Sequence, residues 1–259
     1  DAAGYDDGKT TGFQQNYYGC VTALDRAVGR LRDSLRDHGI ADNTVVTFCS
    51  DNGPEGKDGA PGQQGPFRGR KRSLYEGGVR VPTCMAWPGV IAPGSENNTP
   101  ITSVDVMPTF AELASAKLPT QQPVDGISIV PLLKGKPVPE RSIFWHYPLY
   151  LAAYNIDGQV HNVASTNKPY WRAVPSSMIC RGPWKLMHLF EDNSIRLFNV
   201  EMDIGESKDL SKEHPKKAAA LFAELKQWQA DTKALIPIKQ NASFDPKSPG
   251  NDRKGKGKR

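Results

Sequence analysis

An amphipathic helix pattern that runs into a continuous β-branched segment most limits the folds open to this chain. Between Tyr18 and His38, apolar residues recur at steps of three and four, on a face formed by Val21, Leu24, Val28, Leu31 and Leu35. Gly39 follows as a natural C-terminal cap. Residues 44–48, TVVTF, then have the pattern of a strand buried on both faces. This helix–strand order predicts an α/β domain with a parallel sheet between layers of helices.

Two oxygen-bearing side chains, Asp51 and Asn52, follow that strand directly and precede Gly53. Ligands of parallel α/β sheets lie beyond the carboxyl ends of the strands. Adjacent carboxylate and amide oxygens suit a hard cation such as Ca²⁺ or Mg²⁺, although Ca²⁺ takes about six to eight oxygen ligands. The same pair could instead form an Asx-turn, in which the side chains accept hydrogen bonds from nearby backbone amides. A metal site here would therefore need further acidic groups from elsewhere.

A long Gly/Pro-rich loop at residues 53–72 ends in four cations, Arg68, Arg70, Lys71 and Arg72. Loops of this length inside a compact domain are usually functional. A lysine supplies a mobile point charge and an arginine a planar fork, so the cluster could clamp an anion. Read alone, it could equally be a solvated loop or a contact for a phosphate backbone. The following YEGG segment indicates a sharp turn, with Glu76 and Arg80 as a possible buried structural pair.

The predicted secondary structure changes after Arg141. Before it, residues 79–89 predict a second buried strand and residues 103–115 a helix that starts near Asp105. After it, strand patterns joined by turns occupy residues 141–148, 176–182, 184–192 and 194–203. A helical face follows between Pro215 and Leu235. Sequential hairpins and one helix predict a small α+β unit with an antiparallel sheet.

Composition narrows the classes of function. Hydrophobic residues make up 38% of the chain, enough for a sizeable core. Five of the cations behind the net charge of +5 lie in the last seven residues, RKGKGKR, so we expect a disordered basic tail and no nucleic-acid partner. No apolar run reaches the length of a membrane span. The four cysteines lack zinc-site spacing, and Cys49 and Cys84 are expected to be small core residues.

Taken together, these segments resemble the formylglycine-dependent sulfatases of the arylsulfatase type, within the alkaline-phosphatase-like superfamily. The resemblance rests on TVVTFCSDNGPEG, FRGRKRSLYEGGVRVP, WPGVIAPG, SVDVMPTFAELA and DGISIVPLLKGK, followed by RSIFWHYP, RGPWKL and LFNVEMDIGESKDLS. It implies part of an alkaline-phosphatase-like α/β sandwich at residues 1–139 and a small α+β subdomain at 140–236. Residues 237–259 are then the basic, disordered tail.

The resemblance also implies a chemistry and a site. In this family a hydrated formylglycine attacks the sulfur of a sulfate ester, while Ca²⁺ and a lysine neutralise the sulfate oxygens. Asp51 and Asn52 match two of the family's calcium ligands, and Lys71 matches the catalytic, sulfate-binding lysine. His146, set among aromatic residues, is expected to be a core histidine or to line the substrate cleft. A sulfated carbohydrate or other sulfated small molecule is the expected substrate, with residues 150–171 lining the cleft.

The chain departs from the family pattern in several respects. None of the four cysteines begins the C-x-P-S-R or C-x-A-S-R motif from which formylglycine is made, and the family's other calcium-binding aspartates and histidine-bearing segments have no match. The chain also starts as a loop without Met or signal peptide. We therefore expect the C-terminal portion of a longer enzyme, inactive alone and, by family, periplasmic, secreted or lysosomal. The alternatives are a related phosphate-ester hydrolase and a non-catalytic binder of sulfated glycans.

Overall fold

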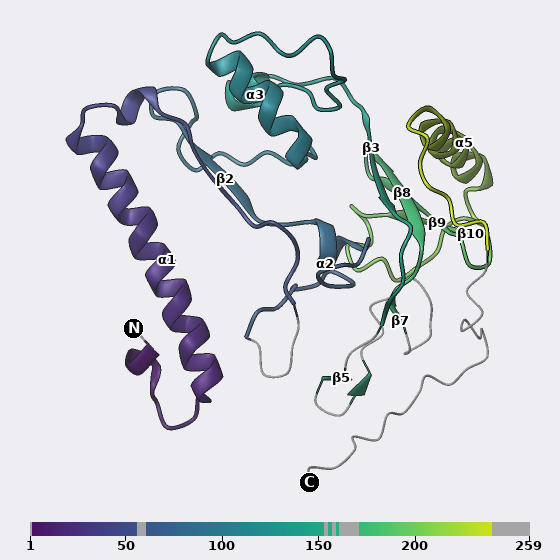
Figure 1. Cartoon of the computed structure of the whole chain (residues 1–259), viewed down its shortest axis with the longest axis horizontal. Helices are drawn as coiled ribbons and strands as arrows, with labels where there is room; N and C mark the ends of the chain where they lie inside the picture. Colours follow the sequence, from purple (N-terminus) through teal and green to yellow (C-terminus); the bar gives the residue numbers. More distant parts are fainter. Residues whose placement is uncertain (1, 56–60, 153–154, 157–158, 161–170, 240–259) are drawn as a thin grey trace. The chain divides into compact units, whose positions relative to one another are not determined.

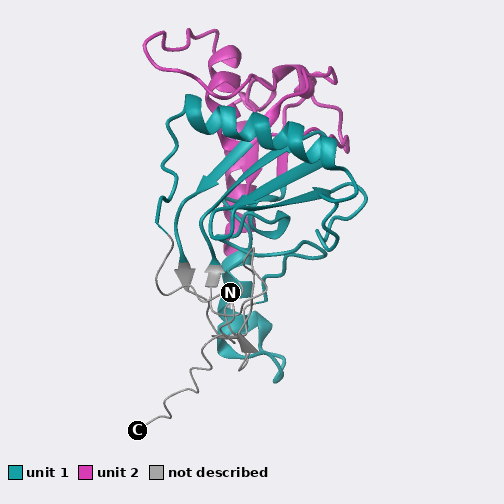
Figure 2. Cartoon of the chain, turned by 90° about the vertical axis from the view of Figure 1, so that its right-hand side faces the viewer, with its two compact units in different colours: residues 1–22, 50–82, 144–259 teal, residues 23–49, 83–143 magenta. Residues whose placement is uncertain are grey.

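The computed structural model describes residues 2–55, 61–152, 155–156, 159–160 and 171–239. The chain divides into two compact units that are each discontinuous in sequence. One contains residues 1–22, 50–82 and 144–259, and the other contains residues 23–49 and 83–143 (Figure 2). None of the described helices combines the length and apolarity needed to cross a lipid bilayer.

The predicted N-terminal helix is confirmed as α1, Gly12–Asp37 (Figure 1), after a 3₁₀ turn at Ala2–Tyr5. It begins earlier than its apolar pattern because a reciprocal cap starts it. The Thr11 amide donates to Gln14 Oε1 (2.9 Å), and the Gln14 amide donates to Thr11 Oγ1 (3.3 Å). Gly39 has a φ of +67°, the left-handed conformation expected at a C-terminal cap.

The two strands expected to be buried are not. After a 3₁₀ turn at Ala41–Asn43, β1 (Val46–Cys49) pairs with β2 (Thr83–Ala86) in an antiparallel ribbon that aligns Val46 with Ala86. Phe48 is 44% exposed, and Cys49 and Cys84 are exposed rather than core residues. Within the described residues β1 has no parallel neighbour. The side chains of both strands are half-buried or exposed, so neither face of this ribbon is fully covered.

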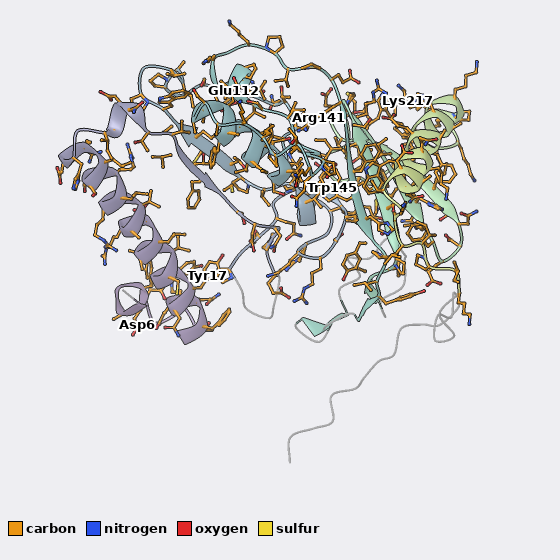
Figure 3. The ribbon with its side chains drawn as sticks, turned by 45° about the horizontal axis from the view of Figure 1, so that its top comes forward. Asp6, Tyr17, Glu112, Arg141, Trp145 and Lys217 are labelled. Carbon is orange, nitrogen blue, oxygen red and sulfur yellow. The ribbon has the colours of Figure 1, made fainter. Side chains whose placement is uncertain are left out.

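The predicted helix near Asp105 is also confirmed, as a 3₁₀ turn at Ser103–Asp105 that continues into α3, Val106–Leu113. The Asp105 carboxylate is nearly fully buried and accepts hydrogen bonds from the Thr102 amide (2.8 Å) and the Ile127 amide (3.0 Å). It also pairs with Arg141 (Figure 3), whose Nη1 lies 2.7 Å from Asp105 Oδ1. The short helix α4, Val130–Leu133, follows in the same unit.

The antiparallel sheet predicted after Arg141 is confirmed. Its strands lie in the order β10-β9-β8-β3: β3 is Ser142–Tyr147, β8 is Ser176–Arg181, β9 is Trp184–Leu189 and β10 is Ser194–Asn199. Asn193 takes a φ of +54° in the predicted hairpin turn. Shorter strands pair beside it: β4 (Leu151–Ala152) with β7 (Trp171–Ala173), and β5 (Asn155–Ile156) with β6 (Gln159–Val160).

Both faces of the β8–β10 sheet are buried. Helix α5, Pro215–Asp231, packs on one face, where Ile179, Leu186, Leu197, Ala218, Leu221 and Leu225 form a cluster. On the other face Met178, Met187 and Phe198 surround Tyr75, the first residue of the YEGG turn, and Trp145 (Figure 3) packs beside them. The alternation of side chains along each strand therefore fills two cores, one of which anchors the predicted site loop.

Candidate functional site

The YEGG segment forms α2, a single helical turn at Glu76–Val79, and its glycines are sites of close backbone approach. The Gly53 amide, one residue after Asn52, donates to the Gly78 carbonyl (3.1 Å). A Cβ atom on Gly53 would lie 1.8 Å from the Gly77 oxygen. Only glycine fits at this contact, so the end of the Asp51–Asn52 segment rests directly on the turn.

The basic loop contacts the same turn. The Gly77 amide donates to the Arg68 carbonyl (2.7 Å), and a Cβ atom on Gly77 would lie 2.3 Å from the Gly69 oxygen. The Lys71 amide donates to the Pro54 carbonyl (3.1 Å). The structure therefore brings together, through their backbones, two of the segments in which the sequence placed functional residues.

The Asp51 and Asn52 side chains are exposed and half-buried, respectively. In the described part of the chain neither makes a hydrogen bond or an ion pair, so the Asx-turn alternative is not formed; Ser50 Oγ instead donates to the Asn52 carbonyl (2.9 Å). Their oxygens are the donor type that Ca²⁺ prefers. Among the described residues, however, no group of three or more His, Cys, Asp or Glu side chains could hold a metal ion. Asp51 and Asn52 therefore offer the type of ligand that Ca²⁺ binds, but only part of the number of ligands that it requires.

The Lys71 ammonium is half-exposed, and its Nζ lies 3.9 Å from Glu55 Oε2. That separation exceeds a hydrogen bond, so the contact leaves the N–H groups of Lys71 able to donate to another anion. Arg72, next in the chain, is exposed and has a φ of +74°. Lys71 and Arg72 thus present charge to solvent from the same turn of the loop.

Arg68, by contrast, makes its contacts with buried groups. Its Nη1 donates to the Glu206 carbonyl (2.9 Å), and its guanidinium lies 4.1 Å from the centroid of the buried Tyr75 ring. The Tyr75 hydroxyl accepts a hydrogen bond from Arg196 (3.0 Å). Burial raises the pKa of Tyr75. Of the loop cations, Arg68 therefore holds the loop rather than facing a ligand.

A buried charge cluster supports the turn from the β8–β10 sheet. Lys185, fully buried on β9, places its Nζ 3.0 Å from Glu76 Oε1 and 2.8 Å from Glu206 Oε1. Glu206 Oε2 accepts the Glu76 amide (2.7 Å), and Arg80 Nη1 lies 3.4 Å from Glu76 Oε2. The expected Glu76–Arg80 pair is thus present, but Arg80 is half-exposed and Lys185 is the buried partner.

The pKa shifts in this cluster follow from burial and mutual attraction. Burial by itself lowers the pKa of Lys185, but the nearby Glu206 and Glu76 carboxylates outweigh it, so the pKa is raised and the ammonium stays charged. Burial raises the pKa of Glu206, an effect that Lys185 offsets only in part. Sequence reasoning missed Lys185 and Glu206; the one signal was a lysine inside the apolar strand WKLMHL.

His146 lies on β3 with both ring nitrogens occupied. Its Nε2 lies 3.0 Å from the Leu235 carbonyl, which can only accept, so Nε2 donates. In the neutral ring, Nδ1 then accepts the Ser177 hydroxyl at 2.6 Å. Among the described residues, no hydrogen bond or ion pair joins His146 to Asp51, Asn52 or Lys71, and its substrate-binding role stays a prediction.

One cavity of about 230 Å³ lies in the unit that holds the C-terminal sheet. It is not lined by Asp51, Asn52, Lys71 or His146, but Tyr150, at the start of the segment 150–171, does line it. Its lining consists of Tyr150, Pro175, Phe190, Glu191, Pro237, Ile238 and Lys239. Most of the segment 150–171, expected to line a substrate cleft, and residues 240–259 of the predicted basic tail lie outside the described residues.

Known proteins resemble this chain over most of its length. The chain matches the family Sulfatase over residues 1–116 and the family N-sulphoglucosamine sulphohydrolase, C-terminal, over residues 62–233. A sulfatase of Formosa agariphila is 39% identical over 217 residues, which cover 78% of this chain and 36% of that protein. Human arylsulfatase A is 42% identical over 128 residues, 49% of this chain and 25% of that protein.

Among solved structures, Ps i-CgsB in complex with k-i-k-neocarrahexaose superposes with a TM-score of 0.71 at 27% identity. The superposition covers 93% of this chain and 48% of that one, so the chain spans about half the length of this structure and about a third or less of the two curated relatives. It confirms the expected fold class, part of an alkaline-phosphatase-like α/β domain followed by an α+β subdomain with an antiparallel sheet and a C-terminal helix. The chain belongs to the sulfatase family.

Proposed function

We propose that this chain forms part of an enzyme that hydrolyses sulfate esters, in which Lys71 binds the sulfate group and Asp51 and Asn52 bind Ca²⁺. The observation that carries the proposal is the shared backbone turn: the Asp51–Asn52 segment and the Lys71 loop both contact Gly77 and Gly78 or their immediate neighbours. Oxygen ligands and a solvent-facing ammonium on one support are what a metal-assisted attack on an anionic ester requires.

Within this site Lys71 has a defined task. Its ammonium donates to a sulfate oxygen and stabilises the negative charge that develops there as the ester bond breaks. Asp51 and Asn52 supply two oxygen ligands for Ca²⁺, which when bound polarises the sulfate oxygens. Arg72, exposed beside Lys71, adds positive potential that attracts an anionic substrate.

The nucleophile and the remaining calcium ligands belong, in this proposal, to sequence outside the 259 residues. Support comes from the superposed structure of Ps i-CgsB, which is about twice as long as this chain, and from the absence of a formylglycine motif in the sequence. Residues 1–139 then complete an α/β domain, and residues 140–236 form its C-terminal subdomain. The proposed compartment is outside the cytoplasm.

A sulfated carbohydrate is the proposed substrate class. Support comes from Ps i-CgsB, which was solved with a neocarrahexaose and is 27% identical to this chain. The sugar and the sulfate position depend on side chains that line the cleft, and the proposal leaves them to experiment.

The test uses the native protein, purified from its source, whose mass and N-terminal peptides are first determined. Sulfate and phosphate release are then measured from sulfated oligosaccharides and from an aryl phosphate, with and without a calcium chelator. We expect sulfate release that the chelator abolishes. Preferential phosphate release would support the related phosphate-ester hydrolase instead. Salt-sensitive binding of sulfated oligosaccharides without turnover would overturn catalysis in favour of a glycan-binding protein.

A further inference from the structure

The Lys185–Glu76–Glu206 cluster lies at the base of the proposed site and has no place in the proposed chemistry. Its three members come from distant parts of the chain: Lys185 is 109 residues from Glu76, and Glu206 is 130 residues from it. Three buried charges are costly to desolvate, and apolar residues of similar volume commonly replace such clusters without loss of stability. A stability role alone therefore gives a poor account of the cluster.

We propose that Lys185 is a positioning residue for the catalytic segment, holding the Glu76–Val79 turn on which the Asp51–Asn52 segment and the Lys71 loop rest. This inference depends on the proposed function only for the roles of the residues that are positioned. Lys185 itself is fully buried and touches neither substrate nor metal in the proposal.

The first step of the argument is that Glu76 is held at two points. Its carboxylate pairs with Lys185 (3.0 Å), and its backbone amide donates to Glu206 Oε2 (2.7 Å). Lys185 also holds Glu206 (2.8 Å), so a single ammonium keeps both carboxylates in the places that fix the start of the turn. Glu206 has a φ of +50°, and its carbonyl accepts Arg68 at the near end of the basic loop (2.9 Å).

The second step is that the turn cannot move without its neighbours. The backbones at Gly53, Gly77 and Gly78 approach so closely that an added Cβ atom on any of them would fall within 2.3 Å of a carbonyl oxygen. Hydrogen bonds from Gly53 to Gly78 (3.1 Å) and from Gly77 to Arg68 (2.7 Å) connect the segments. A displacement at Glu76 is thus passed on to both ligand-bearing segments.

The third step concerns what happens when the ammonium is removed. Two buried carboxylates would then face each other, and the remaining counter-charge on Glu76 would be the half-exposed Arg80 at 3.4 Å. Buried carboxylates that lose their counter-ion must take up a proton or move toward water, so the contacts that hold Glu76 and Glu206 together are lost and the turn is released. The sheet core on the α5 side contains none of these charges and should be affected less.

The test is hydrogen exchange of the native protein and its variants, followed by mass spectrometry of peptides. In Lys185→Met, peptides that cover residues 50–55 and 68–80 should exchange at least about tenfold faster, while peptides from α5 and β10 keep nearly their parental rates. Glu206→Gln removes one carboxylate charge and should give the same local pattern more weakly, which provides a second variant if Lys185→Met does not fold. Lys208→Met, which removes the exposed pair with Glu213, is the matched control and should change neither set.

Two outcomes would overturn the proposal. One is an equal acceleration of all peptides, which would show that Lys185 serves global stability alone. The other is unchanged exchange at residues 50–55 and 68–80. Because exchange requires no substrate, the result is independent of sulfate release: a local effect in a protein without sulfatase activity would leave the support of the turn intact and reject only the proposed function.

Discussion

Helices α1 and α5 have the same kind of apolar periodicity, but the apolar face of α5 is buried and that of α1 is largely exposed. In α5, Leu221 and Leu225 are buried against the β8–β10 sheet. In α1 the only buried residue is Gly19, and Leu24 and Leu31 are each 51% exposed. Helix α3 and strand β1 are similar to α1, because Met107, Phe110 and Phe48 also remain about half-exposed.

Apolar periodicity thus identifies the face of a helix that must be buried. It does not identify the segment that packs on that face, which can come from any part of the chain. On the α5 side of the C-terminal sheet, the fully buried cluster comes from one continuous stretch, 176–231. The apolar faces of α1, α3 and β1 have no such cover among the residues described. The first region should therefore respond to core mutations and the second should not.

The largest effect is expected from Leu225→Ala. This side chain is fully buried, so its truncation should lower the free energy of unfolding by about 4 kcal/mol through lost apolar burial and the cavity left behind. Leu31→Ala in α1 is the control and should cost less than about 1 kcal/mol, since half of that side chain is already in water. Urea unfolding followed by circular dichroism measures both. Equal losses would break the comparison.

Substitutions at two glycines test the same contrast between a closely packed region and the exposed helix α1. Gly53→Ala would place a Cβ atom 1.8 Å from the Gly77 oxygen and should cost about 3 kcal/mol or more, because backbone atoms must move. Gly29→Ala in α1 meets open space and should stabilise the helix by about 1 kcal/mol. Thermal unfolding distinguishes them. A tolerated Gly53→Ala would contradict the close packing of the site segments.

The third prediction concerns Asp105, a buried and hydrogen-bonded carboxylate in the unit of residues 23–49 and 83–143. Burial acts to raise its pKa, but hydrogen bonds from Arg141 and from the Thr102 and Ile127 amides outweigh it, so the pKa is lowered. A carboxyl whose folded pKa is depressed adds stability above its unfolded pKa, about 3.9, and loses it as pH falls through the folded pKa. Asp105→Asn should therefore cost about 2 kcal/mol at pH 7, and progressively less as the pH falls below the unfolded pKa of about 3.9. A parent and variant that lose stability in parallel on acidification would contradict this assignment.

Local sequence patterns were sufficient for much of the fold. The strand patterns at residues 184–192 and 194–203 predicted the β9–β10 hairpin, and the apolar spacing predicted α1 and α5. The environment of β1 and β2 was predicted wrongly. A β-branched run indicates a buried strand, but burial of Cys49 and Cys84 depends on layers that the described residues do not supply.

The candidate site likewise contains residues that the sequence predicted and residues that it did not. The resemblance singled out Asp51, Asn52 and Lys71, and the backbone contacts around Gly77 place their segments together. The supporting charges were not predictable from one sequence. A lysine such as Lys185 and a glutamate such as Glu206 read as surface residues unless their pairing is known, and the positions that they join are more than a hundred residues apart.

The most direct test of the account is the rate of sulfate release by the native protein carrying Lys71→Ala, compared with Arg72→Ala. Both residues are cations at adjacent positions of one loop, but only Lys71 is assigned to the sulfate group. We expect Lys71→Ala to lower kcat about 10²–10³-fold with unchanged stability, and Arg72→Ala to remain within a few-fold of the parent. Equal rates for the parent and Lys71→Ala, or a greater loss in Arg72→Ala, would contradict the assignment of the site.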